Sequence, residues 1–111
     1  MKKHRPLVER ICDYVSQVDA ELGVERAFIY GSTAKGNRLK ESDVDLIIVS
    51  KAFKRMPQPR RLYLLQKLWS YREGLHALAC TPGEFTKASE ERLMMKEILS
   101  YAIELLPETE K

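Results

Sequence analysis

A glycine–serine pair and two closely spaced aspartates are the residues of this chain whose types and spacing could do chemistry. Gly31 and Ser32 follow the apolar segment Phe28–Tyr30, and Asp43 and Asp45 open a second apolar segment after ten intervening residues. Glycine lets backbone amides approach phosphate oxygens closely. A short helix that begins near Ser32 would present free amides and its positive dipole end to an anion. This order predicts a phosphate pocket.

The two aspartates predict a metal site beside that pocket. Asp43 and Asp45 share one face of a strand, with Cα atoms about 6–7 Å apart. Such a pair can converge on Mg²⁺, which takes oxygen ligands and leaves room for substrate phosphates. In two-metal sites the ions stabilise the attacking and the leaving oxygens. The implied chemistry is in-line attack on the α-phosphorus of a nucleoside triphosphate, with pyrophosphate leaving.

Each part of the pattern also has a purely structural interpretation. A Gly-Ser pair after a strand often forms only a turn, and an aspartate at a strand end often caps a neighbouring segment. Lys35 and Arg38, in the intervening loop, could neutralise phosphate charge, although exposed basic loop residues are usually only solvated. Asp45 is the strongest single candidate because a carboxylate inside an apolar strand needs a partner or a metal.

The elements that must position these residues follow from apolar spacing and from helix start and stop signals. A polar loop, with a short helix after Ser32, joins the first two strands. Ser89 is expected to cap the last helix, which would run to about Leu106. The remaining expected elements are a helix over 7–22 ended by Gly23, strands over 26–30, 44–49 and 75–80, a helix over about 59–71, and a short helix after a capping box that begins at Thr81. We predict an α/β (α+β) fold: a small mixed sheet of three to four strands covered by helices.

Length and composition indicate one domain, over 1–106, with a polar tail over 107–111. The apolar share of 44%, the charged share of 32% and the net charge of +3 are ordinary for a globular protein. Cys12 and Cys80 lack metal-ligand spacing and are expected to be buried free thiols, which favours the cytoplasm. No apolar run approaches a membrane span, and no signal peptide is expected.

A basic stretch runs from Lys51 to Arg61, with five basic residues and no acidic one. It is either a solvated loop and helix start or a contact for an acidic partner surface. Aromatic residues are not interleaved through it as in base-stacking platforms, which argues against direct nucleic-acid recognition. Trp69 and Tyr71, further along, are expected in the core or at an interface.

At the glycine, serine and aspartate residues the chain resembles the minimal nucleotidyltransferases of the DNA polymerase β-like superfamily. Their signature is Gly-Ser, about ten residues, then Asp-x-Asp, which is matched here by Gly31-Ser32 and Asp43-Val44-Asp45. The resemblance implies the nucleotidyltransferase fold and Mg²⁺- or Mn²⁺-dependent transfer of a nucleoside monophosphate, with ATP or another nucleoside triphosphate as the substrate. Some minimal members are antitoxins that adenylylate a HEPN-domain partner, and others resemble antibiotic-modifying domains.

The acceptor implied by the resemblance is therefore a hydroxyl on a protein or on a small molecule. A chain of this length could complete a small-molecule pocket only with a second subunit. A homodimer or a hetero-oligomer is consistent with that requirement.

The chain departs from the family pattern at His76. The family carries a third carboxylate on the following strand, and the equivalent position in the strand over 75–80 is His76. His76 could act as a base or a metal ligand, could be an inert replacement, or could be a partly buried histidine unrelated to the site. Because manganese tolerates nitrogen ligands better than magnesium does, we expect any activity to prefer Mn²⁺. The alternative function is a degenerate domain that binds nucleotide or protein without turnover.

Overall fold

The computed structural model describes residues 6–39 and 42–105, and the predicted tail over 107–111 lies outside them. The helices are α1 (Leu7–Leu22), α2 (Gly31–Lys35), α3 (Gln58–Leu68), α4 (Pro82–Glu91) and α5 (Leu93–Tyr101), with a 3₁₀ turn, η1, over Lys51–Phe53. The strands are β1 (Arg26–Tyr30), β2 (Val44–Val49), β3 (Leu75–Cys80) and β4 (Ile103–Leu105). None of the described helices is both long enough and apolar enough to cross a membrane.

The four strands form one mixed sheet in the order β3-β2-β1-β4, which confirms the predicted fold class. β1 runs antiparallel to both β2 and β4, whereas β2 and β3 run parallel. The register aligns Tyr30 of β1 with Asp45 of β2, and Asp45 with His76 of β3. Residues from three strands therefore lie in one row across the sheet.

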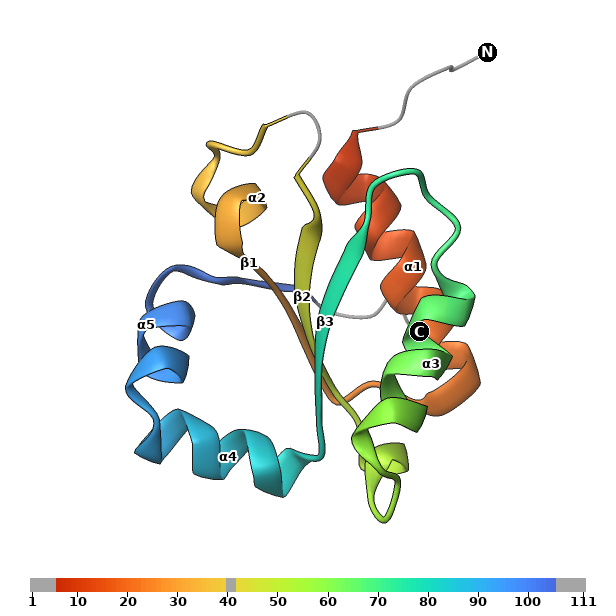
Figure 1. Cartoon of the computed structure of the whole chain (residues 1–111), viewed down its shortest axis with the longest axis vertical. Helices are drawn as coiled ribbons and strands as arrows, with labels where there is room; N and C mark the ends of the chain where they lie inside the picture. The colour runs from red at the N-terminus through yellow and green to blue at the C-terminus, as the bar shows by residue number, and fades with distance from the viewer. Residues whose placement is uncertain (1–5, 40–41, 106–111) are drawn as a thin grey trace, which may run out of the picture.

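Helices cover both faces of the sheet (Figure 1). Alternate residues of β2 divide between two apolar clusters, because successive strand side chains point to opposite faces. Val44, Leu46 and Ile48 pack with α1 and α3, whereas Ile47 and Val49 pack with α4 and α5. This two-sided burial confirms the interpretation of 44–49 as a strand covered on both faces.

Local sequence signals explain two of the helix ends. Gly23 follows α1 with φ of 81°, a conformation that glycine adopts without a steric penalty. Thr81 and Glu84 form the predicted capping box at the start of α4. α3 ends at Leu68, three residues before the predicted end, because Trp69 is extended and its indole nitrogen donates to the Glu73 carbonyl at 2.6 Å.

The prediction for the C-terminal segment was wrong in two respects. Ser89 lies inside α4, where its hydroxyl donates to the Thr86 carbonyl, and so it does not cap a new helix. The break comes instead at Arg92, whose extended backbone separates α4 from α5. The chain then leaves the helical conformation after Tyr101, and Ile103–Leu105 pairs with β1 as the strand β4.

Side chains of α3 cover the outer edge of β3. β3 is an edge strand, so no neighbouring strand donates hydrogen bonds to the carbonyls on its outer side. Gln66 donates to the Leu75 carbonyl at 2.8 Å, and Gln58 donates to the Ala79 carbonyl at 3.2 Å. These side-chain amides satisfy backbone groups that would otherwise remain open to another strand.

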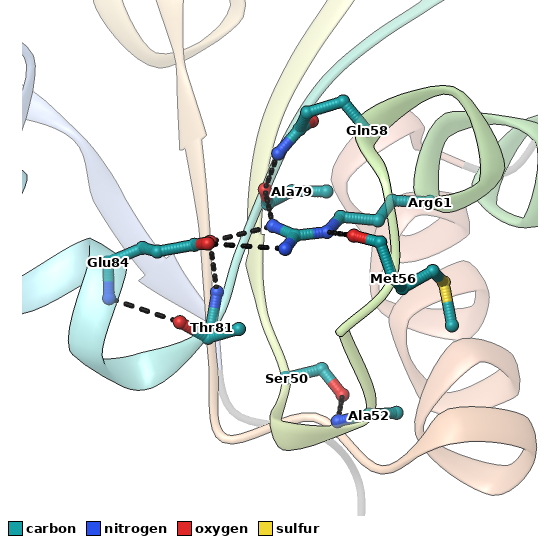
Figure 2. A network of polar contacts seen from close by, with 8 residues as sticks. All are labelled: Ser50, Ala52, Met56, Gln58, Arg61, Ala79, Thr81 and Glu84. Atoms are coloured by element: carbon teal, nitrogen blue, oxygen red, sulfur yellow. Dashed lines mark hydrogen bonds and ion pairs between the residues drawn. The ribbon is translucent and has the colours of Figure 1, made fainter. Parts of the chain in front are cut away.

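The basic stretch is not uniformly solvated, because Arg61 turns inward between α3 and α4 (Figure 2). Its Nε donates to the Met56 carbonyl at 2.8 Å, and Nη1 donates to the Ala79 carbonyl at 3.1 Å. Its Nη1 and Nη2 also bind both carboxylate oxygens of Glu84, at 2.6 and 3.2 Å. The hydrogen bonds from Arg61, followed by those from Thr81, hold the pKa of Glu84 below its ordinary value.

Partial burial of apolar and thiol side chains completes the packing. Trp69 and Tyr71 are half-buried and pack against the α1 side of the core, as the sequence indicated. Cys80 is a free thiol, as expected, but both Cys80 and Cys12 are only partly buried.

Candidate functional site

Two carboxylates stand at the end of the sheet face that α4 and α5 cover. Asp43 immediately precedes β2, and Asp45 is its second residue, so both share a face with Ile47 and Val49. The apolar pair packs against α4 and α5, whereas the Asp45 side chain is 24% exposed and Asp43 is open to solvent. The apolar core beneath α4 and α5 therefore ends near the start of β2, where the side chains on this face are polar.

Two glycines make room for these carboxylates. A Cβ at Gly31 would collide with Oδ2 of Asp45, and a Cβ at Gly74 would collide with Oδ1 of Asp43. Gly31 also has φ of 70°, which side chains rarely tolerate. Gly31 is thus required both by its backbone conformation and by the close approach of Asp45. Sequence reasoning selected Gly31 but not Gly74, which has no recognisable motif around it.

His76 lies directly beside Asp45. Its Nδ1 is 3.0 Å from Oδ1 of Asp45, and its side chain is 62% exposed. His76 is therefore exposed rather than partly buried, and it contacts the carboxylate of Asp45.

Tyr101, at the end of α5, contacts two of the predicted nucleotide-binding residues. The backbone N–H of Gly31 donates to its hydroxyl at 3.1 Å, and Nζ of Lys35 lies 4.7 Å from the centre of its ring. Burial, followed by the charge of Asp45 and the nearby Tyr101, raises the pKa of Tyr30 to about 12. Sequence reasoning missed Tyr101 because it placed this residue within a helix that continued to about residue 106.

The remaining predicted residues lie on or after α2. Ser32 is in the first turn of α2, and its carbonyl accepts the N–H groups of Gly36 and Asn37. The Arg38 guanidinium donates to the Ser42 carbonyl at 2.5 Å. The pKa of Glu73 is lowered mainly by hydrogen bonds from Arg10, with a smaller contribution from the charge of Arg38.

Two buried polar atoms of this loop have no hydrogen-bond partner among the described residues. They are Oγ1 of Thr33 and Nε of Arg38. Most buried polar atoms in folded proteins are paired, so an unpaired atom calls for a specific explanation. Both atoms lie in the segment between Gly31 and Asp43, where the sequence predicts a bound triphosphate.

The donor chemistry of the site fits a hard divalent cation. Asp43 and Asp45 would hold the ion, because carboxylates are preferred ligands for Mg²⁺ and Mn²⁺. Within residues 6–39 and 42–105, no three His, Cys, Asp or Glu side chains form a metal-binding group by themselves. Magnesium sites of this class commonly take one or two carboxylates and complete their ligands with substrate phosphates and water. A bound ion would supply charge neutralisation at the phosphates.

A groove of about 730 Å³ runs along β3. His76 lines this groove and also contacts Oδ1 of Asp45. Its apolar lining includes Leu62 of α3 and Met94 and Met95 of α5. A second molecule seated in the groove would lie against His76.

Comparison with known proteins gives a consistent assignment. The nucleotidyltransferase domain family matches residues 8–110, nearly the whole chain. The crystal structure of a "putative nucleotidyltransferase" from Sulfolobus solfataricus is similar, with 25% sequence identity and a TM-score of 0.51. The similarity covers 78% of this chain and 84% of that one. No curated protein matches the chain. With the Gly-Ser turn and the paired aspartates in the arrangement described, the chain belongs to the nucleotidyltransferase domain family, within the DNA polymerase β-like superfamily.

Proposed function

We propose that this protein transfers AMP from ATP to a hydroxyl group in a reaction that depends on Mg²⁺ or Mn²⁺. The observation that carries the proposal is the approach of the Asp45 carboxylate to the backbone of Gly31. It brings a predicted metal ligand against the turn that is predicted to hold phosphate. Ser32 would donate its hydroxyl to the triphosphate, and Lys35 and Arg38 would neutralise its charge. Catalysis of this kind consists mainly of positioning and charge neutralisation.

The acceptor that we propose is a hydroxyl on a protein of the HEPN type, so that the chain would act as an antitoxin in the cytoplasm. The groove beside His76 supports a large acceptor, because it is lined by exposed apolar side chains such as Met94. A small hydroxylated molecule would need walls from a second subunit.

A second candidate function is favoured by the identity of residue 76. With imidazole where the family has a carboxylate, the site would hold nucleotide but turn over poorly, since imidazole is a weaker ligand for Mg²⁺. The protein would then act by contact with its partner, as a regulatory or antitoxin subunit.

One experiment with two measurements tests both functions. ATP binding is measured by calorimetry with Mg²⁺, with Mn²⁺ and without metal, on the wild type and on Asp45→Asn. The same samples are incubated with a HEPN-domain protein and ATP labelled at the α-phosphate. We expect metal-dependent binding and label transfer in the wild type, both reduced at least about 100-fold in Asp45→Asn, because the metal loses a charged ligand.

The control variant is Glu90→Gln, which removes an exposed carboxylate on α4 and should behave as the wild type. Binding without transfer under either metal would favour the second candidate. A folded protein that binds no ATP under any metal would contradict both.

A further inference from the structure

Tyr101 is the described residue that joins the predicted phosphate-binding turn to the C-terminal half of the chain. It is half-buried at the end of α5. Its hydroxyl accepts a hydrogen bond from Gly31, the first residue of α2, and its ring lies beneath the ammonium group of Lys35, the last. One side chain thus holds both ends of the short helix.

The Gly31 peptide is fixed from two sides. On one side the Asp45 carboxylate occupies the space that a Cβ would fill. On the other side the Gly31 N–H donates to Tyr101 at 3.1 Å. A glycine has the greatest conformational freedom of any residue, so a turn built on it needs such contacts to remain in one arrangement. Asp45, a predicted metal ligand, makes one of these contacts with Gly31, and Tyr101 makes the other.

The position of Tyr101 is set by the sheet. Two residues after it, Ile103 pairs with Ile29 of β1, and Ile29 lies two residues before Gly31. Met95 and Ile98, on the same helix as Tyr101, are buried in the cluster that contains Tyr30. The ends of β1 and α5 are therefore tied together by strand pairing and by core contacts.

The contact with Lys35 restricts a long and flexible side chain. A lysine ammonium within about 6 Å of an aromatic ring centre is attracted by the electrons of the ring. Nζ of Lys35 lies at 4.7 Å from the Tyr101 ring centre. An exposed lysine otherwise samples many rotamers and loses that conformational entropy when it binds an anion. Because the ring already restricts the Lys35 side chain, the entropy that remains to be lost on binding is smaller.

We propose that Tyr101 is a positioning residue of the nucleotide site, where its hydroxyl fixes the Gly31 peptide and its ring directs Lys35 toward the triphosphate. This inference rests on the proposed function. It assigns to α5 a role in substrate affinity that neither the motif residues nor the family assignment contains.

Affinities for ATP, ADP and AMP test the proposal on the wild type, Tyr101→Phe and Tyr101→Leu. Tyr101→Phe keeps the ring and loses one hydrogen bond, so we expect ATP to bind about fivefold more weakly. Tyr101→Leu also loses the ring, so the loss should reach about tenfold or more. Both losses should grow from AMP to ATP, because the turn and Lys35 are expected to contact the phosphates. Tyr63→Phe, at a 58% exposed position on α3, is the control and should bind as the wild type.

A double-mutant cycle separates positioning from general stability. Lys35→Met should weaken ATP binding in the wild type and should have little further effect in Tyr101→Leu, because the two residues act together. In the nucleotide-free protein, Tyr101→Phe should move the amide proton resonance of Gly31 upfield. Equal ATP affinities of the wild type and both Tyr101 variants would overturn the inference, even if the Gly31 resonance moved. A wild type that binds no ATP would overturn the proposed function itself.

Discussion

At the scale of single residues, the row Tyr30–Asp45–His76 lies at the centre of the proposed site. The register places a phenol, a carboxylate and an imidazole side by side across three strands. Nδ1 of His76 lies 3.0 Å from Oδ1 of Asp45. A carboxylate at position 76 would instead repel Asp45 unless a cation lay between the two groups. His76 therefore keeps Asp45 paired in the absence of metal and contributes less negative charge to a metal site than a carboxylate would.

His76→Asp should complete the three-carboxylate set that the family resemblance implies. We expect the wild type to support transfer better with Mn²⁺ than with Mg²⁺, and His76→Asp to raise the Mg²⁺-supported rate by about tenfold. The rates are measured with ATP labelled at the α-phosphate under each metal. His76→Asn is the matched control, because it retains a hydrogen-bonding group and adds no charge. Rates of the wild type that are equal or higher in Mg²⁺ would count against coordination by His76.

At the scale of elements, the pair Arg61–Glu84 connects α3 to the start of α4. The Arg61 side chain is 6% exposed and that of Glu84 is 51% exposed, so the pair extends from the interior to the surface. Arg61 also binds the carbonyl of Ala79, near the end of β3. Because α4 leads into α5, this contact fixes the base of the segment that ends at Tyr101.

Glu84→Gln should destabilise the protein by about 1–2 kcal/mol at pH 7, because the buried guanidinium loses its counter-charge but keeps its carbonyl partners. The hydrogen bonds from Arg61 hold the folded pKa of Glu84 below the ordinary value for a glutamate. Its contribution is therefore fully present above about pH 4.5 and is lost as the pH falls through the lower, folded pKa. Denaturant unfolding at pH 7 and near pH 3 measures this dependence. A gap between the wild type and Glu84→Gln that does not narrow at the lower pH would contradict the role of the charge.

At the scale of the whole molecule, one sheet supports two apolar layers that share β1 and β2 as common strands. Trp69, the single tryptophan, packs edge-on against Tyr14 on the α1 side, with ring centres 4.8 Å apart. The layer with α4 and α5 contains no tryptophan. Fluorescence therefore reports one layer, whereas circular dichroism reports the helices of both.

Unfolding followed by Trp69 fluorescence and by circular dichroism should give coincident transitions, because both layers share the same central strands. The measurement is a urea titration of the wild type with both signals. A fluorescence midpoint that differs from the dichroism midpoint would show that the two layers unfold separately, and the predicted single domain would be wrong.

The parts of the fold that sequence predicted are those governed by near neighbours along the chain. Apolar runs located three of the strands, and the capping box at Thr81 located α4. The alternation of side chains along a strand put Asp43 and Asp45 on one face. The last strand was missed because Ile103 and Leu105 only pair with β1 after the chain folds back. The inward turn of Arg61 and the contact of Tyr101 with Gly31 were missed for the same reason: both depend on partners distant in sequence.

The side chains that cover the outer edge of β3 also affect how the protein behaves when it is crowded. An uncovered edge strand can add a strand from another molecule and begin an aggregate. Here Gln58 and Gln66 already donate to the carbonyls that such a strand would use, at Ala79 and Leu75. A strand that added to this edge would have to displace both side-chain amides from these carbonyls, which disfavours growth of the sheet on this side.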